Sequence, residues 1–565
     1  MRIVIIGGVA GGMSTAARIR RLDESAEIIV LERGEYVSFA NCGLPYHVGD
    51  EITDRSDLVL HTPRSLRDSL NLDVRVLNEV VSVNAAGQEV IVRDVLTGVE
   101  SKVSYDALVL ATGAEPIVPN IVGVELPQVR TLRTVPDAER LRGFIDRGAT
   151  RAVVVGAGFI GIEVVEAFVN RGLDVTLVEL APQVLPALDA DMATMVEDEL
   201  RRHGVHVNTG VAVTAIEPTG RGSEVSVLLT DDCRVLADVV LLGVGVRPAS
   251  SLAVDAGLKI SERGAIIVDQ TQRTSDRHIW AVGDATQVVD AITGLPSVVP
   301  LAGPANRQGR MAANAICRRP SASKPVMGTA IVRVFDLTAA VTGLTSRGLD
   351  RAGITHHVVH LHPNDHSGYY PGAEALHLAV MFGTDGRLLG AQAVGASGVD
   401  KRIDVLATAI RAQMTMSDVA ELELAYAPPF GSAKDPVNMA GFIAENVLDG
   451  TTTQWHSQDI GSYDAATHLL VDVRSAKEFC TGHLPGAINI PHTELRERLS
   501  ELVTQANGRQ VWVYCASGFR SYLAHRVLAG HGIDSATLDG GLQTLRAVAP
   551  QLLLEGCAPS LQLVS

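Results

Sequence analysis

Apolar runs that end in glycine-rich turns occur at two places in the chain. Such a run followed by a helical pattern and a second apolar run is typical of a βαβ unit with a parallel sheet. The first unit is predicted as a strand over 3–6, a turn over 7–12, a helix over about 13–22 and a strand over 28–31. The second is predicted as a strand over 152–155, a turn over 156–161, a helix to about 170 and a strand over 175–178. The chain therefore carries two nucleotide-binding folds.

The pattern changes twice farther along. Residues 318–325 are polar and proline-bounded, which is typical of a linker, and 451–454 mark a second boundary. Between them, strands are predicted over 330–335, 377–382 and 388–394, and helices from about 401 and 437. After them, strands over 469–473 and 510–514 flank a helical stretch. We expect an α/β protein with four domains: 1–112 with 245–325, 113–244, 326–450 as an α+β domain, and 456–556 as a small α/β domain.

Composition narrows the functional classes. A chain of 565 residues is long enough for three or four domains at roughly 150 residues each. The net charge of −16 argues against nucleic-acid or anionic-membrane binding. Six scattered cysteines with no CxxC argue against a secreted disulfide scaffold and favour a reducing cytoplasm. The first apolar run is too short for a signal-peptide core or a membrane span.

The second glycine turn is a full G-x-G-x-x-G fingerprint formed by Gly156, Gly158 and Gly161. In this context its glycines admit a pyrophosphate to a helix N-terminus. Glu179 ends the next strand, 18 residues beyond Gly161, where it can hydrogen-bond a ribose 2′-hydroxyl and repel a 2′-phosphate. The sequence therefore favours NADH over NADPH.

The first fingerprint is imperfect because Val9 stands where the middle glycine is expected between Gly7 and Gly12. Support comes from Glu32, 20 residues after Gly12, with Arg33 beside it. Two later segments also support it, Thr112-Gly113 after a strand, and 279–284, which ends in Asp284. In flavoproteins with two dinucleotide folds, the carboxylate of the latter segment hydrogen-bonds the ribityl chain of the flavin. These matches in order predict FAD.

Cys42 follows the first unit and has no cysteine partner nearby. It lies in the segment Ser38-Phe39-Ala40-Asn41-Cys42-Gly43-Leu44-Pro45-Tyr46, and the next cysteine is Cys233. A lone redox cysteine can form only a mixed disulfide with an external thiol or an oxidised sulfenate. The chemistry therefore divides between a thiol-dependent reductase and a peroxidase or oxidase.

These motifs together resemble the pyridine nucleotide-disulfide oxidoreductase fold over residues 1–450, with the part after 325 as its dimer interface domain. The segment 38–46 resembles the coenzyme A-disulfide reductase group, which uses one cysteine. The resemblance implies a homodimer with FAD in 1–112 and 245–325, NAD in 113–244, and coenzyme A as the external thiol. Positions matching the coenzyme A contacts of the family are Ser14, Arg18, Arg21, Ser38, Asn41 and Lys434. Arg20 offers a further cation on the same predicted helix.

The resemblance also implies a tyrosine pair. The loop 426–436 comes from the partner subunit in that family, and its Tyr426 approaches the flavin and the cysteine. Tyr369-Tyr370 matches the second tyrosine segment; the sequence does not decide which of the two points inward, and Tyr370 is taken as the candidate. These phenols would supply a proton, or else pack at the interface.

Five histidines (356, 357, 360, 362 and 366) invite a metal interpretation. Strand alternation places His360 and His362 on one face, but no cysteine or carboxylate spacing completes a site. We interpret them as surface or interface residues.

Near the C-terminus, the strand 510–514 leads through Cys515 and Arg520 into a helix. A cysteine at such a turn faces backbone N–H groups and the positive helix end, which stabilise a thiolate or persulfide. With the segments 471–479 and 482–491, this resembles a single rhodanese domain over about 456–556. The resemblance implies that Cys515 carries sulfane sulfur and that Asp472 and Arg474 support the loop. The other cysteines (233, 317, 480 and 557) match no motif and are interpreted as structural or incidental.

The predicted function is an NADH-dependent flavoprotein that reduces coenzyme A persulfide, polysulfide or coenzyme A disulfide, with small-molecule sulfur substrates and no nucleic-acid or membrane partner. Two alternatives remain open. One is an NADH oxidase or peroxidase that works through a Cys42 sulfenate. The other is a sulfurtransferase or sulfide sensor in which the flavoprotein part regulates the rhodanese unit.

Overall fold

The structure is a computed structural model that describes residues 1–320 and 322–554. It divides into two compact units. The first comprises Met1–Val184 and Leu200–Gly328, and the second comprises Leu185–Glu199 and the chain from Thr329 onward.

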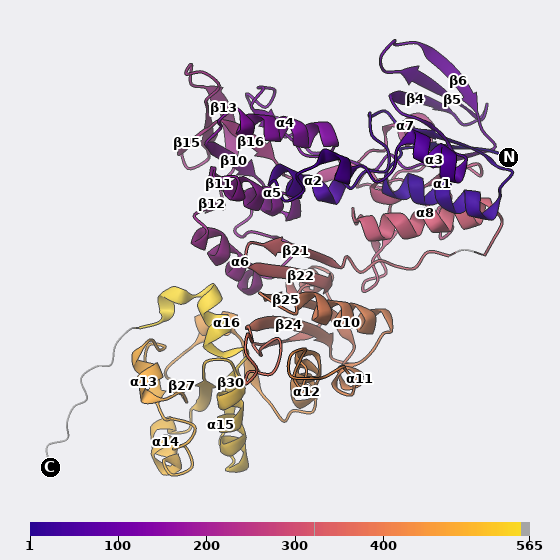
Figure 1. Ribbon diagram of the computed structural model, residues 1–565. Helices are drawn as coiled ribbons and strands as arrows, with labels where there is room; N and C mark the ends of the chain where they lie inside the picture. Colours follow the sequence, from indigo (N-terminus) through magenta and orange to yellow (C-terminus); the bar gives the residue numbers. More distant parts are fainter. Residues whose placement is uncertain (321, 555–565) are drawn as a thin grey trace. The chain divides into compact units, whose positions relative to one another are not determined.

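The first unit begins with a parallel five-stranded sheet in the order β18-β7-β1-β2-β3. Its strands are β1 (Arg2–Ile6), β2 (Glu27–Leu31), β3 (Asp73–Arg75), β7 (Ala107–Leu110) and β18 (Ile279–Ala281). Alternate residues of β1 enter two different cores, Ile3 and Ile5 one and Val4 and Ile6 the other. This is why β1 is apolar at every position rather than alternating. Helices α1 (Ala10–Leu22) and α8 (Ala302–Ile316) run side by side along the first core (Figure 1).

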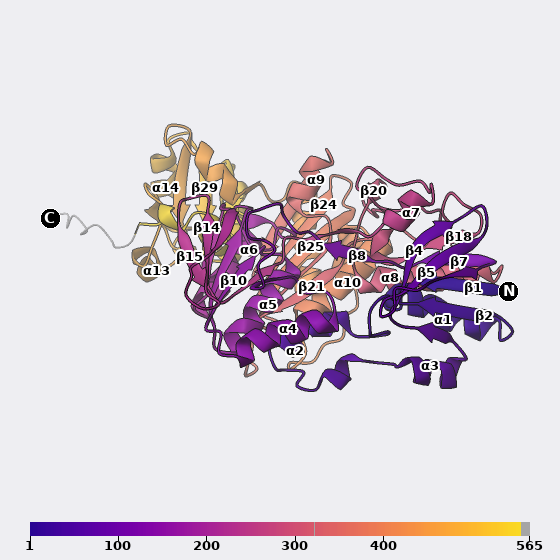
Figure 2. The same ribbon diagram turned by 90° about the horizontal axis from the view of Figure 1, so that it is seen from above.

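A second parallel sheet, in the order β12-β11-β10-β16-β9, repeats this plan. Its strands are β9 (Val129–Arg130), β10 (Arg151–Val155), β11 (Asp174–Glu179), β12 (His206–Thr209) and β16 (Val239–Leu242). Helix α5 (Phe159–Asn170) follows the glycine turn after β10. The short helix α2 (Leu44–Val48) lies beside α5 and α4 (Val135–Asp146) in both views (Figures 1 and 2).

Small antiparallel sheets complete the first unit. They consist of β4 (Asn78–Asn84), β5 (Glu89–Asp94) and β6 (Glu100–Ser104); β13 (Val213–Pro218), β14 (Val225–Leu229) and β15 (Arg234–Ala237); β8 (Ala114–Pro116) with β17 (Val246–Pro248); and β19 (Val288–Val289) with β20 (Pro296–Ser297). The remaining helices are α3 (Pro63–Leu70) and α7 (Ser251–Asp255). The β8–β17 pair joins the strands by which the chain enters and leaves the second sheet region.

The second unit contains an antiparallel sheet in the order β21-β22-β25-β24-β23 and a parallel sheet in the order β26-β30-β29-β27-β28. The first is built from β21 (Ala330–Val334), β22 (Leu337–Gly343), β23 (His356–Leu361), β24 (Leu376–Gly383) and β25 (Leu388–Gly395), with α9 (Ser346–Arg351), α10 (Val399–Arg411), α11 (Met416–Ala420) and α12 (Pro436–Leu448). The second is built from β26 (Gln454–Trp455), β27 (His468–Asp472), β28 (Ile488–Asn489), β29 (Gln510–Tyr514) and β30 (Ser535–Leu538), with α13 (Ala476–Cys480), α14 (Leu499–Ala506), α15 (Phe519–Gly530) and α16 (Gly541–Val548). Helix α6 (Ala190–Arg202) begins in this unit and ends in the first.

The predicted α/β fold class is confirmed, and the apolar strands lie within a residue of their predicted bounds. Helix α1 begins at Ala10, three residues earlier than predicted, because Gly11 and Gly12 belong to its first turn. A side chain on Gly12 would lie 1.9 Å from the Gly7 carbonyl oxygen, so the close approach requires glycine there. The strands of the small antiparallel sheets were not predicted. Among residues 1–320 and 322–554, no helix combines the length and apolar character that crossing a bilayer requires.

Candidate functional site

The first glycine turn forms a tight cradle at the end of β1. Gly7 has φ +102°, and a side chain on it would lie 2.3 Å from the Ala111 carbonyl oxygen. Val9, in place of the usual middle glycine, caps α1 with φ −113°, which any residue can adopt. The Glu32 carboxylate accepts hydrogen bonds from the N–H groups of Gly8 and Gly34, both at 2.8 Å. The turn is therefore shaped for close approach of a phosphate, with a carboxylate beside it.

Asp284 and Gly113 lie near this cradle around the guanidinium of Arg133. Burial raises the pKa of Asp284, and the nearby Arg133 opposes that shift. A side chain on Gly113 (φ +70°) would meet the Arg133 guanidinium at 2.6 Å. Thr112 donates its hydroxyl to the Ala249 carbonyl at 2.6 Å, which holds the turn after β7, and Arg33 is exposed. A half-buried carboxylate beside two tight glycine turns suits a polar, phosphate-containing ligand such as a dinucleotide.

The second glycine turn repeats the first. Gly156 has φ +102°, and a side chain on Gly161 would lie 1.9 Å from the Gly156 carbonyl oxygen. Nothing lies within 4 Å of where a side chain on Gly158 would be, so the backbone there is open to a ligand. The Glu179 carboxylate accepts from Ala157 N at 2.6 Å and Ala181 N at 2.7 Å. The predicted residues of this fingerprint are thus brought together.

Cys42 lies in a short 3₁₀ turn, Asn41–Gly43, that is fastened to the first cradle. Ser38, with φ +50°, donates its N–H to the Gly8 carbonyl at 2.7 Å, and Ala40 N donates to Leu58 O at 2.8 Å. The residue as a whole is exposed, although neighbouring atoms partly enclose its sulfur. Ser38 and Asn41 therefore lie in the same segment as Cys42, which passes beside the first glycine turn.

The residues after Cys42 bind the other nucleotide fold. Tyr46 donates its hydroxyl to Glu163 of α5 at 3.4 Å, and His47 Nε2 lies 2.9 Å from Glu139 of α4. Burial of the sulfur, Glu163 and Asp284, in that order, raise the pKa of the Cys42 thiol. The sulfur therefore lies within the influence of a carboxylate from each nucleotide fold.

The predicted coenzyme A residues on α1 lie in a cluster of arginines. Burial and the neighbouring charges of Arg310, Arg319 and Arg21 lower the pKa of Arg18. Ser14 donates its hydroxyl to Asn306 of α8. Arg310 and Arg319 were missed by the sequence reasoning, because only the packing of α8 against α1 brings them to this place. Four like charges together are suited to an anion with several phosphates.

Arg20 has a structural role and does not join this cluster. It is buried, and its guanidinium donates to the carbonyls of Leu70, Glu24, Ala26 and Asn71 at 2.6–2.9 Å. All its donors face the protein, so it cannot also bind a ligand.

In the second unit, the predicted tyrosine loop is exposed. The Tyr426 hydroxyl lies 3.3 Å from that of Tyr369, whereas Tyr370 packs edge-on against His366 with ring centroids 5.9 Å apart. Within the single chain, Tyr369 rather than Tyr370 lies beside Tyr426. Lys434 is exposed, and the adjacent Asp435 is held by Arg402 at 2.9 Å, which fixes the start of α12.

Cys515 follows β29, and its side chain is buried. The thiol donates to Ser521 Oγ at 3.5 Å, and Ser521 in turn accepts from Thr537 at 2.8 Å and donates to Gly518 O at 2.9 Å. Residues 515–518, here called the Cys515 loop, turn into α15 through Gly518 at φ +94°. The sulfur is thus oriented by a hydroxyl relay at a helix N-terminus.

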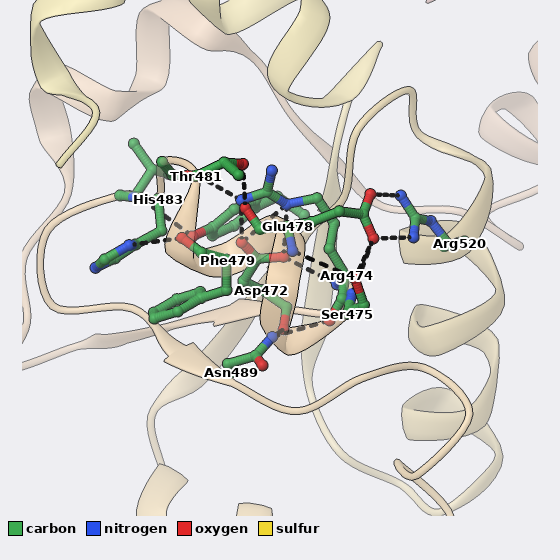
Figure 3. Close-up of polar contacts among 12 residues, drawn as sticks. Asp472, Arg474, Ser475, Glu478, Phe479, Thr481, His483, Asn489 and Arg520 are labelled. Carbon is green, nitrogen blue, oxygen red and sulfur yellow. Dashed lines mark hydrogen bonds and ion pairs between the residues drawn. The ribbon is translucent and has the colours of Figure 1, made fainter. Parts of the chain in front are cut away.

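Arg520 is held near this thiol by a residue that the sequence analysis did not select. Its guanidinium forms a two-fold ion pair with Glu478, at 2.7 and 2.9 Å (Figure 3). The Arg520 guanidinium and the Ser475 hydroxyl lower the pKa of Glu478 to about 2. The signal was available, since Glu478 stands three residues after Ser475 in a capping-box pattern.

Asp472 and Arg474 form a buried ion pair at 2.6 Å, and Arg474 also donates to Gly482 O at 2.6 Å (Figure 3). They anchor the segment that carries Ser475 and Glu478. Their support of the Cys515 loop is therefore indirect and passes through Glu478 and Arg520.

The five histidines do not act as one group. His356 accompanies Asp350, His357 stacks on Phe382, and His366 pairs with Asp365 at 2.9 Å. His360 and His362 share one face, as predicted, and contact Asp539 and Thr544 near the start of α16. Of the unassigned cysteines, Cys233 is exposed, Cys317 is half-buried, and Cys557 lies outside the described residues.

Comparison with known protein families decides the identity of the fold. The family described as pyridine nucleotide-disulphide oxidoreductase matches residues 1–309, and its dimerisation domain matches 329–436. The chain belongs to this family. A rhodanese-like domain matches residues 452–547, so this oxidoreductase carries a C-terminal rhodanese domain.

Two curated relatives each align with 79% of this oxidoreductase. A coenzyme A disulfide reductase of Staphylococcus haemolyticus is 35% identical over 449 residues and is covered completely. An NADH oxidase of Methanocaldococcus jannaschii is 35% identical over 450 residues, with 99% of it covered.

Two solved structures match this oxidoreductase together with its rhodanese domain. Reduced Bacillus anthracis CoADR-RHD is 44% identical with a TM-score of 0.95, covering 98% of this chain and 99% of that one. An NAD-dependent persulfide reductase from A. fulgidus is 38% identical with a TM-score of 0.89, covering 96% of this chain and 100% of that one. The family implies FAD and NAD(P)H, and the two glycine cradles described above fit two dinucleotides.

Proposed function

We propose that the chain is a homodimeric NADH-dependent reductase of coenzyme A persulfide, polysulfide or coenzyme A disulfide. The observation that carries the proposal is the lone Cys42, fastened to the first glycine turn by Ser38 and to the second nucleotide fold by Tyr46 and His47. The names of the relatives and solved structures support the same substrate class.

The residues divide the work as follows. The cradle of Gly7, Gly12 and Glu32 would hold FAD, and that of Gly156, Gly161 and Glu179 would hold NADH. FAD, when bound, supplies the two-electron link between nicotinamide and sulfur. Glu179 favours NADH because its carboxylate would repel a 2′-phosphate.

Cys42 is the sulfur that receives the substrate. Its thiolate attacks one sulfur of the S–S bond of the substrate, which forms a Cys42–sulfur bond and releases the other sulfur as a thiol or hydrogen sulfide. Reduction of the Cys42–sulfur bond then restores the thiolate, and the net reaction consumes two electrons and two protons. Coenzyme A persulfide, NADH and a proton then give coenzyme A, hydrogen sulfide and NAD⁺. Burial, Glu163 and Asp284 raise the pKa of the thiol, so hydrogen-bond donors must stabilise the Cys42 thiolate for the attack. The exposed phenols of Tyr426 and Tyr369, from the partner subunit, are the proposed donors.

The rhodanese domain would carry sulfane sulfur on Cys515. The N-terminus of α15 and the guanidinium of Arg520 lie near the sulfur. Both favour an anionic persulfide.

The test is anaerobic NADH oxidation with each of the three substrates. We expect Cys42→Ser to abolish turnover with all of them. We expect Cys515→Ser to retain coenzyme A disulfide reduction and to lose sulfur transfer from thiosulfate. Cys233→Ser, an exposed cysteine of the same unit as Cys42, is the matched control and should behave as wild type. Full turnover in Cys42→Ser would overturn the proposal.

A second candidate is an NADH oxidase or peroxidase working through a Cys42 sulfenate. The exposure of Cys42 and the similarity to the NADH oxidase of Methanocaldococcus jannaschii favour it. It predicts rapid NADH oxidation with oxygen or peroxide and no dependence on coenzyme A. Measuring both activities on one preparation separates the two functions.

A further inference from the structure

His360 and His362 hold one short segment of the rhodanese domain. That segment, Asp539–Thr544, leaves β30 and forms the first turn of α16. His360 Nδ1 lies 2.6 Å from Asp539 Oδ2, and the backbone N–H of His360 donates to Asp539 Oδ1 at 2.9 Å. His362 Nε2 lies 2.9 Å from Thr544 Oγ1 at the other end of the segment. Two histidines at the end of β23, in the antiparallel sheet of the second unit, therefore hydrogen-bond to this segment at both of its ends.

The contact between the two histidines and this segment is close and involves charged side chains. A side chain on Gly540 would lie 2.7 Å from His360 Cβ and 3.1 Å from His362 Nε2, so only glycine allows this approach. His360 Nε2 is also 2.7 Å from Asp191, and the side chains of His360 and Asp539 are 12% and 2% exposed. A carboxylate buried this deeply requires a compensating charge. Each ring nitrogen of His360 faces a carboxylate, and both can be hydrogen-bonded only if both nitrogens carry a proton. Asp191 and Asp539 accordingly hold the pKa of His360 well above its usual value, against the effect of burial.

Other polar groups complete the surroundings of His360. His456 Nδ1 lies 3.3 Å from Asp539, and Gln454 donates to Asp539 at 3.2 Å. His362 contacts His377 at 2.7 Å, and burial lowers the pKa of His362 to about 3, so it is neutral. The positive charge facing Asp539 from β23 is thus that of His360.

The same segment holds the Cys515 loop from its other side. Leu542 N donates to Cys515 O and Gln543 N donates to Ala516 O, both at 2.9 Å. These are N–H groups of the first turn of α16, which have no partner within their own helix. A side chain on Gly541 would lie 2.8 Å from Ala516 O. The backbone of the sulfur-carrying loop is therefore fixed by residues two to four positions from Asp539.

We propose that His360 is a positioning residue for sulfur transfer at Cys515. It holds Asp539, so that the first turn of α16 stays hydrogen-bonded to Cys515 and Ala516. The dimerisation domain, through β23, thereby sets the geometry of the rhodanese site. This inference rests on the proposed function of Cys515 as a sulfur carrier.

Two substitutions of the full-length protein separate the two bonds of the His360 ring. In His360→Asn, the amide nitrogen takes the place of Nδ1 and can still donate to Asp539. In His360→Gln, it takes the place of Nε2, which faces Asp191, and Asp539 loses its ring donor. Both variants remove the charge, so charge alone cannot explain a difference. His356→Asn, on the same strand with Ile354 and Asp350 as neighbours, is the control.

The first readout is sulfur transfer from thiosulfate to cyanide. Cys515 thiolate takes one sulfur and releases sulfite, and cyanide then removes that sulfur as thiocyanate. We expect His360→Gln to lower kcat roughly tenfold to a hundredfold with little change in the KM for thiosulfate, as for a misplaced catalytic group. His360→Asn and His356→Asn should stay near wild type. NADH-dependent reduction of coenzyme A disulfide should be the same in all four proteins, which also reports folding.

The second readout is the rate of iodoacetamide alkylation of Cys515, followed on its peptide by mass spectrometry. A loosened loop exposes the thiol, so we expect faster alkylation in His360→Gln alone. Equal behaviour of His360→Gln and His360→Asn in both readouts would overturn the positioning role. If the wild-type protein transfers no sulfur, the proposed function of Cys515 fails, and the alkylation rates still decide the role of His360.

Discussion

Cys42 and Cys515, the two cysteines of the proposed function, differ in the surroundings of their sulfur atoms. Cys42 is exposed, and two carboxylates help to keep its thiol protonated. Cys515 is buried against a hydroxyl, beside a guanidinium. The sequence identified both cysteines from their local motifs, yet it missed Glu478, which holds Arg520. A side chain that acts through another residue leaves a weaker signature than one placed at a turn.

At this scale, we expect Glu478→Gln to weaken sulfur transfer. A neutral amide cannot form the two charged bonds that hold Arg520, so kcat/KM from thiosulfate to cyanide should fall about tenfold. Glu501→Gln removes an ion pair of the same kind, with Arg498, in the same domain. An equal fall in both variants would argue against a role for Glu478 in positioning.

The same pair predicts a pH effect on stability. The hydrogen bonds that Glu478 accepts from Arg520 and Ser475 lower the pKa of its carboxyl from 4.5 to about 2. The stabilisation is therefore present above about pH 4.5 and is lost as the pH falls toward 2. Between pH 5 and 3, the melting temperature of the wild type should drop more than that of Glu478→Gln. The difference should be modest, because both side chains are partly exposed.

At the scale of elements, the buried parallel strands could be predicted and the small antiparallel sheets could not. Strands such as β1 and β10 are apolar throughout because both faces are covered. Strand β6 (Glu100–Ser104) has one buried residue among five, so its pattern resembles a polar loop. Arg18 and Arg21 of the arginine cluster were predicted, whereas Arg310 and Arg319 were missed for a different reason. Arg310 lies almost three hundred residues after Arg18, and only helix packing joins them.

This packing yields a prediction about coenzyme A substrates. We expect Arg310→Ala with Arg319→Ala to raise the KM for coenzyme A disulfide by roughly tenfold, since each lost phosphate contact costs a charged hydrogen bond. The KM for NADH and the kcat should change little. Arg64→Ala, which removes an exposed arginine of the same unit, is the control. An unchanged KM for coenzyme A disulfide would place the phosphates elsewhere.

At the scale of the whole molecule, we propose that a second chain completes the active site. The matching dimerisation domain supports a dimer, and the Tyr369–Tyr426 pair is exposed in the single chain. The sequence suggested the loop but not which tyrosine joins it, because adjacent residues point in different directions and only the folded loop selects one.

Complementation between two inactive proteins tests this arrangement. One carries Cys42→Ser and the other carries Tyr369→Phe with Tyr426→Phe. If each site takes its cysteine from one protomer and its tyrosines from the other, a mixed dimer has one intact site. We therefore expect coenzyme A disulfide reduction to return when the two chains are co-expressed with different tags and the mixed dimer is purified. No recovery would mean that each site uses the tyrosines of its own chain.

The paired carboxylates Glu32 and Glu179 have a consequence for engineering. Each one joins a glycine turn to the turn after the next strand by accepting two backbone N–H hydrogen bonds. Replacing Glu179 with a residue that accommodates a 2′-phosphate would also remove the two hydrogen bonds that Glu179 accepts from the backbone. The preference for one coenzyme is thus coupled to the rigidity of the second glycine turn. A variant selective for NADPH would need a second substitution that replaces the lost hydrogen bonds.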